Sequence, residues 1–186
     1  MSDPVTRERL VELLAGHGVL ETARRAGVRP PQEVTYARGT APERWLVDGD
    51  EQLPIERHRQ AHRDGTPSEA ALAYGAGTDP ELAADRLLAL AALARETGLL
   101  RAVCPVPGEG TGQRPGSWCV EDLGAIVAAR AALPDDVRVR PHWVRLGAGA
   151  CQVAVAFGAD DWRLPPESGD DPEHLAAAVG ARAVAR

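Results

Sequence analysis

Three side chains late in the sequence have the chemistry of acid–base catalysis: His142, Asp160 and Asp161. Residues 137–143 alternate like a strand, so we expect His142 near the carboxyl end of that strand, where barrel enzymes place reactive groups. The adjacent carboxyl groups of Asp160 and Asp161 are able to act as an acid and a base. The alternative for the aspartates is that they cap the next turn, and for His142 that it is a wall residue.

Two larger side chains flank the same expected strand end. The indole of Trp143 is suited to stacking on a ring, and the guanidinium of Arg145 is suited to binding an anion. We therefore predict both as ligand contacts. The alternative interpretation is a core indole and a surface arginine.

The cysteines and histidines do not form a metal-binding pattern. Cys104, Cys119 and Cys151 lie 15 and 32 residues apart, and none belongs to the Cys-x-x-Cys pair of a zinc site. Cys104 and Cys119 could be nucleophiles, but we interpret both as small packed residues. His58 and His62 have a spacing compatible with metal binding, yet the glutamate of a zinc hydrolase is missing between them. We predict exposed helix histidines and no metal.

A glycine-rich segment, residues 108–112, follows an expected strand. It lacks the Lys-Ser/Thr pair of a phosphate-binding loop and does not open directly into a helix. We interpret it as a flexible loop, with phosphate binding as the alternative.

Composition limits the class of protein. The chain has 186 residues, 44% of them hydrophobic and 26% charged, which suits one soluble domain. All 21 basic residues are arginines spread along the chain, and the net charge is −6, so nucleic-acid binding is not expected. No apolar run is long enough for a membrane span, and the first residues do not form a signal peptide. We expect a cytoplasmic protein.

The expected elements alternate between strands and helices. Strands are predicted at residues 33–38, 67–74, 99–106 and 137–143, with one or two further short strands, including one near residues 180–186. The chain divides into a helical lead-in (1–31), a strand with a polar link (32–53), and strand–helix units (54–186). Five or six strands are too few to close an eight-stranded barrel. We therefore predict an α/β fold, either a partial TIM-like barrel or an open, mainly parallel sheet with outer helices. A homodimer or a full-length relative could cover the open edges.

One motif resembles a known family. Trp143-Val-x-Leu-Gly, followed by Gln152-Val-Ala and by Phe157-Gly-Ala-Asp-Asp161, is similar to the C-terminal half of a group of radical S-adenosylmethionine enzymes. The group comprises aminofutalosine synthase, cyclic dehypoxanthine futalosine synthase and F0 (deazaflavin) synthase. Tyr74 stands where these enzymes have a Tyr-Gly-His-x-Glu-Thr strand end, so the resemblance implies a ligand contact there. The family's histidine and glutamate are replaced by Ala76 and Thr78.

The resemblance fails at the iron–sulfur cluster. In the family the first strand leads into a Cys-x-x-x-Cys-x-x-Cys loop, whereas no cysteine follows Tyr36 here until Cys104. The resemblance then implies a descendant without cluster chemistry or cofactor, acting as an accessory or metabolite-binding protein in menaquinone biosynthesis by the futalosine route or in deazaflavin biosynthesis. The alternative is a small half-barrel enzyme with acid–base or hydrolytic chemistry, using His142, Asp160 and Asp161.

Overall fold

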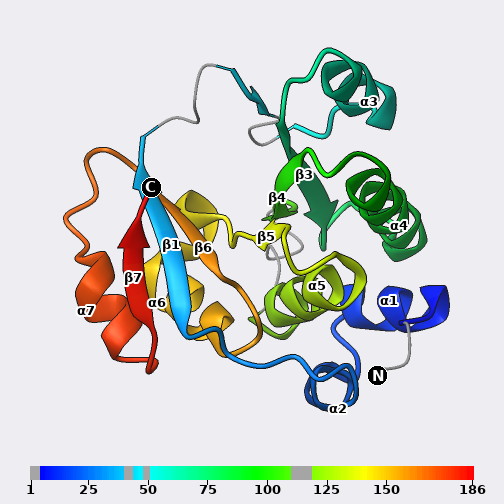
Figure 1. Cartoon of the computed structure of the whole chain (residues 1–186). Helices are drawn as coiled ribbons and strands as arrows, with labels where there is room; N and C mark the ends of the chain where they lie inside the picture. Colours follow the sequence, from blue (N-terminus) through cyan, green and yellow to red (C-terminus); the bar gives the residue numbers. More distant parts are fainter. Residues whose placement is uncertain (1–4, 40–43, 48–50, 110–118) are drawn as a thin grey trace.

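Strands and helices alternate along most of the chain in the computed structural model, which describes residues 5–39, 44–47, 51–109 and 119–186 (Figure 1). The strands are β1 (Glu33–Arg38), β2 (Leu46–Val47), β3 (Ser68–Tyr74), β4 (Leu100–Pro107), β5 (Arg138–Val139), β6 (Asp161–Leu164) and β7 (Arg182–Ala185). The helices are α1 (Arg7–Leu14), α2 (Val19–Arg25), α3 (Ile55–Arg63), α4 (Pro80–Thr97), α5 (Cys119–Ala132), α6 (Trp143–Val155) and α7 (Pro172–Ala177).

All strand pairs are parallel and fall into two sheets, in the orders β2-β3-β4-β5 and β6-β1-β7. The sheets meet between β5 and β6, where the amide of Asp160 donates to the carbonyl of Val139 at 3.1 Å. The amide of Val139 donates in turn to the Asp160 carboxylate at 2.8 Å. The Asp160 side chain thus takes the place of the next backbone hydrogen bond between β5 and β6. The two sheets together form one parallel arc with helices outside (Figure 1). The predicted parallel α/β sheet is confirmed.

Helix α4 begins and ends where the sequence predicts. Asp79 accepts a hydrogen bond from the Glu81 amide at 2.9 Å, and Pro80 occupies the first helical position. Gly98 ends the helix in the left-handed conformation, with φ of 62°.

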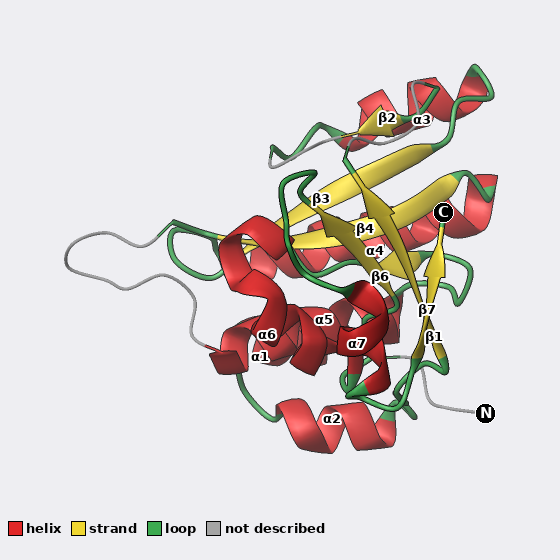
Figure 2. Ribbon diagram, turned by 90° about the vertical axis from the view of Figure 1, so that its left-hand side faces the viewer, coloured by secondary structure: helices red, strands yellow, loops and turns green. Residues whose placement is uncertain are grey.

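Two apolar clusters lie between the strands and the helices. The larger one packs β3, β4 and β5 against α1, α4 and α5, and includes Leu72, Leu90 and Ile126. The smaller one packs β1 and β6 against α6 and α7 and is built on Trp143 and Trp162, whose rings meet edge to face at 5.7 Å. Helices α5 and α6 pack side by side between the clusters (Figure 2). Apolar burial on the helix side therefore joins both sheets into one layer.

A close helix contact depends on one glycine. At Gly124 of α5, a β-carbon would lie 2.1 Å from the carbonyl oxygen of Leu13 in α1. A side chain at this position would push the two helices apart, so glycine is required here.

Two local predictions were wrong. Strand β5 ends at Val139, and Trp143 begins helix α6 instead of ending a strand; the ring of His142 caps this helix by accepting from the Arg145 amide at 3.2 Å. Gly147, with φ of 78° and ψ of 165°, interrupts α6 after its first turn. Strand β2 falls in the segment predicted as a polar link and pairs with the start of β3.

None of the helices in the described ranges is long and apolar enough to cross a membrane.

Candidate functional site

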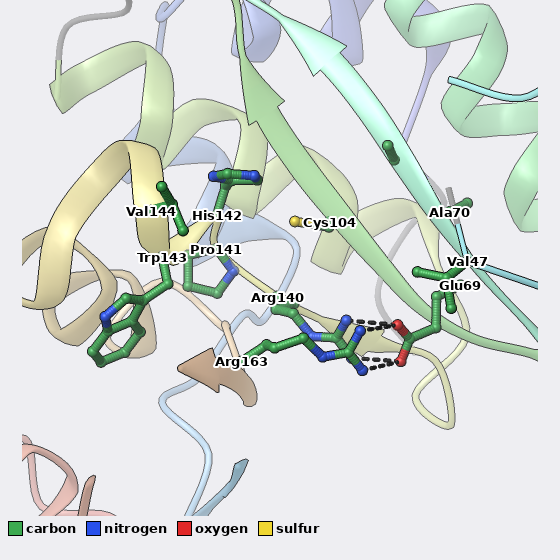
Figure 3. Close-up of a pocket in the computed structure, with 11 residues that line it drawn as sticks. Val47, Glu69, Ala70, Cys104, Arg140, Pro141, His142, Trp143, Val144 and Arg163 are labelled. Carbon is green, nitrogen blue, oxygen red and sulfur yellow. Dashed lines mark hydrogen bonds and ion pairs between the residues drawn. The ribbon is translucent and has the colours of Figure 1, made fainter. Parts of the chain in front are cut away.

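The inner side of the sheet, opposite the helices, carries a cavity of about 200 Å³. Alternation along β3 explains much of its position, because Leu72 and Tyr74 face the helices whereas Glu69 and Ala71 line the cavity, together with the small Ala70 between them. The remaining walls come from β2, β4, β6 and the segment from β5 into α6, and include Val47, Cys104, Arg140, His142, Trp143 and Arg163 (Figure 3). We call this space the inner cavity.

Two arginines share one carboxylate in the wall of the inner cavity. Arg140 donates to both oxygens of Glu69, at 2.8 and 2.7 Å, and Arg163 donates to the same two oxygens at 2.8 and 3.0 Å (Figure 3). Such two-point pairing fixes both guanidinium planes on the carboxylate. Glu69 and Arg140 are only 4% and 6% exposed, whereas Arg163 is 19% exposed.

A second carboxylate lies behind the first pair. Asp161 accepts from Nε of Arg140 at 2.5 Å and from the hydroxyl of Thr35 at 2.7 Å. Arg186 also donates to Asp161. Arg140 therefore bridges two buried carboxylates from strands β3 and β6, and the network ties the two sheets together on the inner side.

Cations outnumber carboxylates in this network. The side chains of Arg140, Arg163 and Arg186 meet only Glu69 and Asp161 among the described residues. The buried Nε of Arg163 has no hydrogen-bond partner. One positive charge is thus left over at the wall of a cavity, in a chain whose net charge is −6.

Burial and charge oppose each other in setting the pKa values of the network. Burial alone would raise the pKa of Glu69, but hydrogen bonding and charge from Arg140, with further charge from Arg163, outweigh it and hold the pKa below 4.5. Burial also lowers the pKa of Arg186, only partly offset by Asp161. Glu69 is therefore a carboxylate at neutral pH and a fixed hydrogen-bond acceptor.

The structure brings two of the predicted site residues to the inner cavity. His142 and Trp143 both line it, at the point where the chain turns from β5 into α6. The ring of His142 also caps α6, and the indole of Trp143 packs on Trp162 in the smaller core cluster. Both residues hold the cavity wall in place, and their contact with a ligand stays a prediction.

Two other predicted contacts lie away from the inner cavity. Tyr74 is buried on the helix side, and its hydroxyl donates to Asp122 at 2.7 Å. The guanidinium of Arg145 donates to the carbonyl of Pro107 at 2.8 Å and lies 3.4 Å from Glu109. Neither lines this cavity.

The paired aspartates hold the fold and do not cap a turn. Asp160 accepts from Arg138 at 3.0 Å and from the Val139 amide, and Arg130 lies 3.7 Å away. Its pKa is raised because burial outweighs these contacts. The capping interpretation is wrong, since neither aspartate accepts from a following helix start, and neither lines the inner cavity.

The prediction of exposed helix histidines was also wrong. His58 and His62 are buried, and both rings contact the hydroxyl of Ser68, at 2.9 and 2.8 Å. The other ring nitrogen of His62 lies 2.8 Å from the hydroxyl of Thr97. The two rings therefore dock α3 onto β3 and α4.

The cysteines lie on three different elements of the described chain. Cys104 is on β4 and lines the inner cavity, Cys119 is exposed at the start of α5, and Cys151 is buried in α6. Burial raises the pKa of the Cys151 thiol well above its usual range, which disfavours a thiolate. Within the described residues no three His, Cys, Asp or Glu side chains are arranged to hold a metal ion. Most of the glycine-rich segment, from residue 110 onward, lies outside the described residues.

Sequence reasoning missed the three residues that define the wall. Glu69 is the lone charge in the apolar strand Ser-Glu-Ala-Ala-Leu-Ala-Tyr, and a buried carboxylate there requires a partner. Arg163 belongs to Asp-Trp-Arg-Leu, where charged and apolar residues alternate as on a strand with one polar face. These two patterns would have predicted opposite charges on one face of the sheet, although not that Arg140 joins them.

Fold and cavity together define a parallel α/β protein with outer helices and a charged cavity on the inner side of its sheet. No family model matches the chain. In sequence it is similar to the 5-amino-6-(D-ribitylamino)uracil--L-tyrosine 4-hydroxyphenyl transferase of Archaeoglobus fulgidus, at 29% identity over 113 residues. It is 30% identical over 121 residues to 5-amino-6-(D-ribitylamino)uracil--L-tyrosine 4-hydroxyphenyl transferase 1 of Methanosarcina barkeri.

These matches cover 58% of this chain but 33% and 31% of the two relatives, so the chain spans about a third of their length. They support the F0 synthase part of the resemblance seen in the sequence. Among solved structures, the YdjI aldolase of Escherichia coli K12 is similar over 90% of this chain and 75% of its own, at 13% identity and a TM-score of 0.38.

Proposed function

We propose that this protein binds a small polar metabolite in the inner cavity and carries no iron–sulfur cluster of its own. The observation that supports this most is the composition of the inner side of the sheet. A closed barrel fills its interior with layers of packed side chains, whereas here a cavity is lined by Glu69, Arg140 and Arg163. A few fixed polar groups in an otherwise apolar wall are typical of ligand sites.

The cysteines do not suit a cluster. A [4Fe–4S] cluster of the radical S-adenosylmethionine kind needs three thiolates close together. The three cysteines of this chain come from a strand and two helices, and the Cys151 thiol is buried with a raised pKa. We therefore assign the cavity a binding role without chemistry at a cluster.

The relatives suggest a metabolic setting. By their names they transfer a 4-hydroxyphenyl group from L-tyrosine to 5-amino-6-(D-ribitylamino)uracil, which connects this chain with deazaflavin biosynthesis. We propose an accessory role beside a full-length enzyme of this kind, with a ligand drawn from the same reaction.

Calorimetric titration with L-tyrosine and with 5-amino-6-(D-ribitylamino)uracil tests this function. Val47 lies at the rim of the cavity and is 37% exposed, so Val47→Trp should block entry with little effect on the core. We expect at least one compound to bind and Val47→Trp to weaken its binding at least tenfold. Leu82→Trp, on the exposed side of α4, is the matched control and should bind as the wild type does.

Two results would contradict the proposal. One is binding of neither compound, or binding that Val47→Trp leaves unchanged. The other is stoichiometric iron and sulfide in protein purified without oxygen, together with cleavage of S-adenosylmethionine.

One observation favours a second candidate, a small acid–base enzyme. His142 lines the same cavity as Glu69 and Cys104. On this alternative His142→Ala abolishes turnover of a bound metabolite while its affinity is retained, which product analysis after incubation would detect. Asp160 and Asp161 have no part in it, because neither lines the cavity.

A further inference from the structure

We propose that the inner cavity is an anion site, in which Arg163 releases Glu69 and binds a carboxylate or phosphate group of the ligand. The inference deepens the proposed function by naming the ligand's chemical class, and it rests on that function only in using the same cavity. It is argued from the pairing pattern of Glu69, Arg140 and Arg163.

The first step concerns which arginine can move. Glu69 keeps two hydrogen bonds from Arg140 when Arg163 leaves, because Arg140 reaches both carboxylate oxygens by itself. Arg140 cannot exchange in the same way, since it also holds Asp161 through Nε and is only 6% exposed. Arg163 is therefore the exchangeable cation.

The second step concerns what Arg163 gains. Its Nε is buried without a partner, and its two terminal nitrogens share an acceptor that Arg140 already occupies. A planar guanidinium pairs best with a carboxylate or phosphate that offers two oxygens. A ligand anion in the cavity would give Arg163 such a pair and an acceptor within reach of its free Nε–H.

The third step concerns the local charge. Three guanidinium groups meet two carboxylates in the network. Among the described residues, the network thus carries surplus positive charge at the wall of the inner cavity. A low-dielectric wall strengthens the attraction of such charge for an anion.

The experiment uses simple probes in place of metabolites. Inorganic phosphate and acetate are titrated into the full chain at constant ionic strength, set with sodium chloride, and the 15Nε–1Hε NMR resonance of Arg163 is followed. Assignment comes from its loss in Arg163→Gln. We expect a saturable shift of this resonance with at least one probe, and the stronger probe distinguishes a phosphate ligand from a carboxylate ligand.

Three variants separate anion binding from a structural role. Arg163→Gln should lose at least tenfold in probe affinity, measured by calorimetry. Arg182→Gln removes an exposed arginine of strand β7 in the same sheet, paired with Glu33, and should leave the affinity unchanged. Glu69→Gln removes the negative charge that Arg163 shares with Arg140, so the probe should raise its unfolding midpoint more than that of the wild type.

The inference is overturned if neither probe gives a saturable shift, or if Arg163→Gln and the wild type bind it alike. If the pairing of Arg163 with Glu69 serves the fold alone, Glu69→Gln should be destabilised and the probe should not raise its unfolding midpoint. Failure of both metabolites in the calorimetric titration, with phosphate or acetate still bound at Arg163, would reject the proposed ligands and leave the anion site standing.

Discussion

The two sides of the parallel sheet are built from alternate residues of the same strands, yet they differ in kind. The helix side is apolar next to the strands, with Leu72, Leu87 and Leu90 fully buried. The inner side carries a cavity and a network of arginines and carboxylates. Apolar burial drives folding, whereas a buried ion pair contributes little net stability and is costly to break. The helix side therefore accounts for the fold, and the inner side is where function is to be sought.

The largest expected effect comes from removing the shared arginine of the inner side. Arg140→Met deprives Glu69 and Asp161 of their common partner and should lower the free energy of unfolding by about 3–5 kcal/mol. Urea denaturation measures it. Arg182→Met, which removes an exposed pair with Glu33, should cost less than about 1 kcal/mol. Equal losses in both variants would show that the network on the inner side matters no more for stability than an exposed ion pair.

A cavity on the helix side should cost nearly as much. Leu72 of β3 is fully buried against the helices, so Leu72→Ala is expected to lower the free energy of unfolding by about 2–5 kcal/mol. Leu72→Met conserves volume and should cost less than about 1.5 kcal/mol. The assignment of stability to the helix side would be contradicted if Leu72→Ala left the free energy of unfolding unchanged but abolished binding of phosphate or acetate in the inner cavity.

The cap of α4 gives a smaller effect on the helix side. Asp79 accepts from the amide of Glu81, and its replacement in Asp79→Ala leaves that amide without its partner. We expect a loss of about 1 kcal/mol in the free energy of unfolding. Asp79→Asn retains an accepting oxygen and serves as the control, and the interpretation fails if it is as unstable as Asp79→Ala.

The pH dependence of stability tests the buried histidine pair. Burial, then the charge of His58 and then that of Arg101, lower the pKa of His62 below 6.5. A lowered pKa in the folded state means that the unfolded chain binds the proton more tightly, so stability is complete above pH 6.5 and declines as the pH falls through the folded pKa. His62→Gln should flatten this decline in urea titrations below pH 6.5. His174→Gln, at an exposed position of α7, should keep it. An unchanged slope in His62→Gln would contradict the assignment.

The fold could be predicted where local signals were strong. Strands β3 and β4 stand out by their apolar runs, β1 by its Val-Thr-Tyr sequence, and α4 by Asp79-Pro80 at its start and Gly98 at its end. Strand β2 has two residues, too few for any periodicity. Trp143 was misplaced because the residues from the two-residue strand β5 to the helix cap at His142 continue the alternation of a strand.

The candidate site was predictable only in part, for a physical reason. His142 and Trp143, singled out for their chemistry, line the inner cavity, although they stand at a helix start and not at the predicted strand end. The pairing of Glu69 with Arg140 and Arg163 joins positions 71 and 94 residues apart, and such pairing depends on which strands become neighbours. The buried histidines likewise depended on where α3 docks, which its arginine-rich sequence did not reveal.

The free energy of unfolding of Arg163→Gln, with and without saturating phosphate or acetate, tests the central claim most directly. Glu69 stays paired with Arg140 through both oxygens when Arg163 is removed. The free energy of unfolding of the variant without ligand should therefore fall by no more than about 1 kcal/mol. A bound anion stabilises the folded state by mass action, and this gain should appear in the wild type and vanish in Arg163→Gln. A variant that is strongly destabilised, or one that the anion stabilises as much as the wild type, would show that Arg163 serves the fold and binds no ligand.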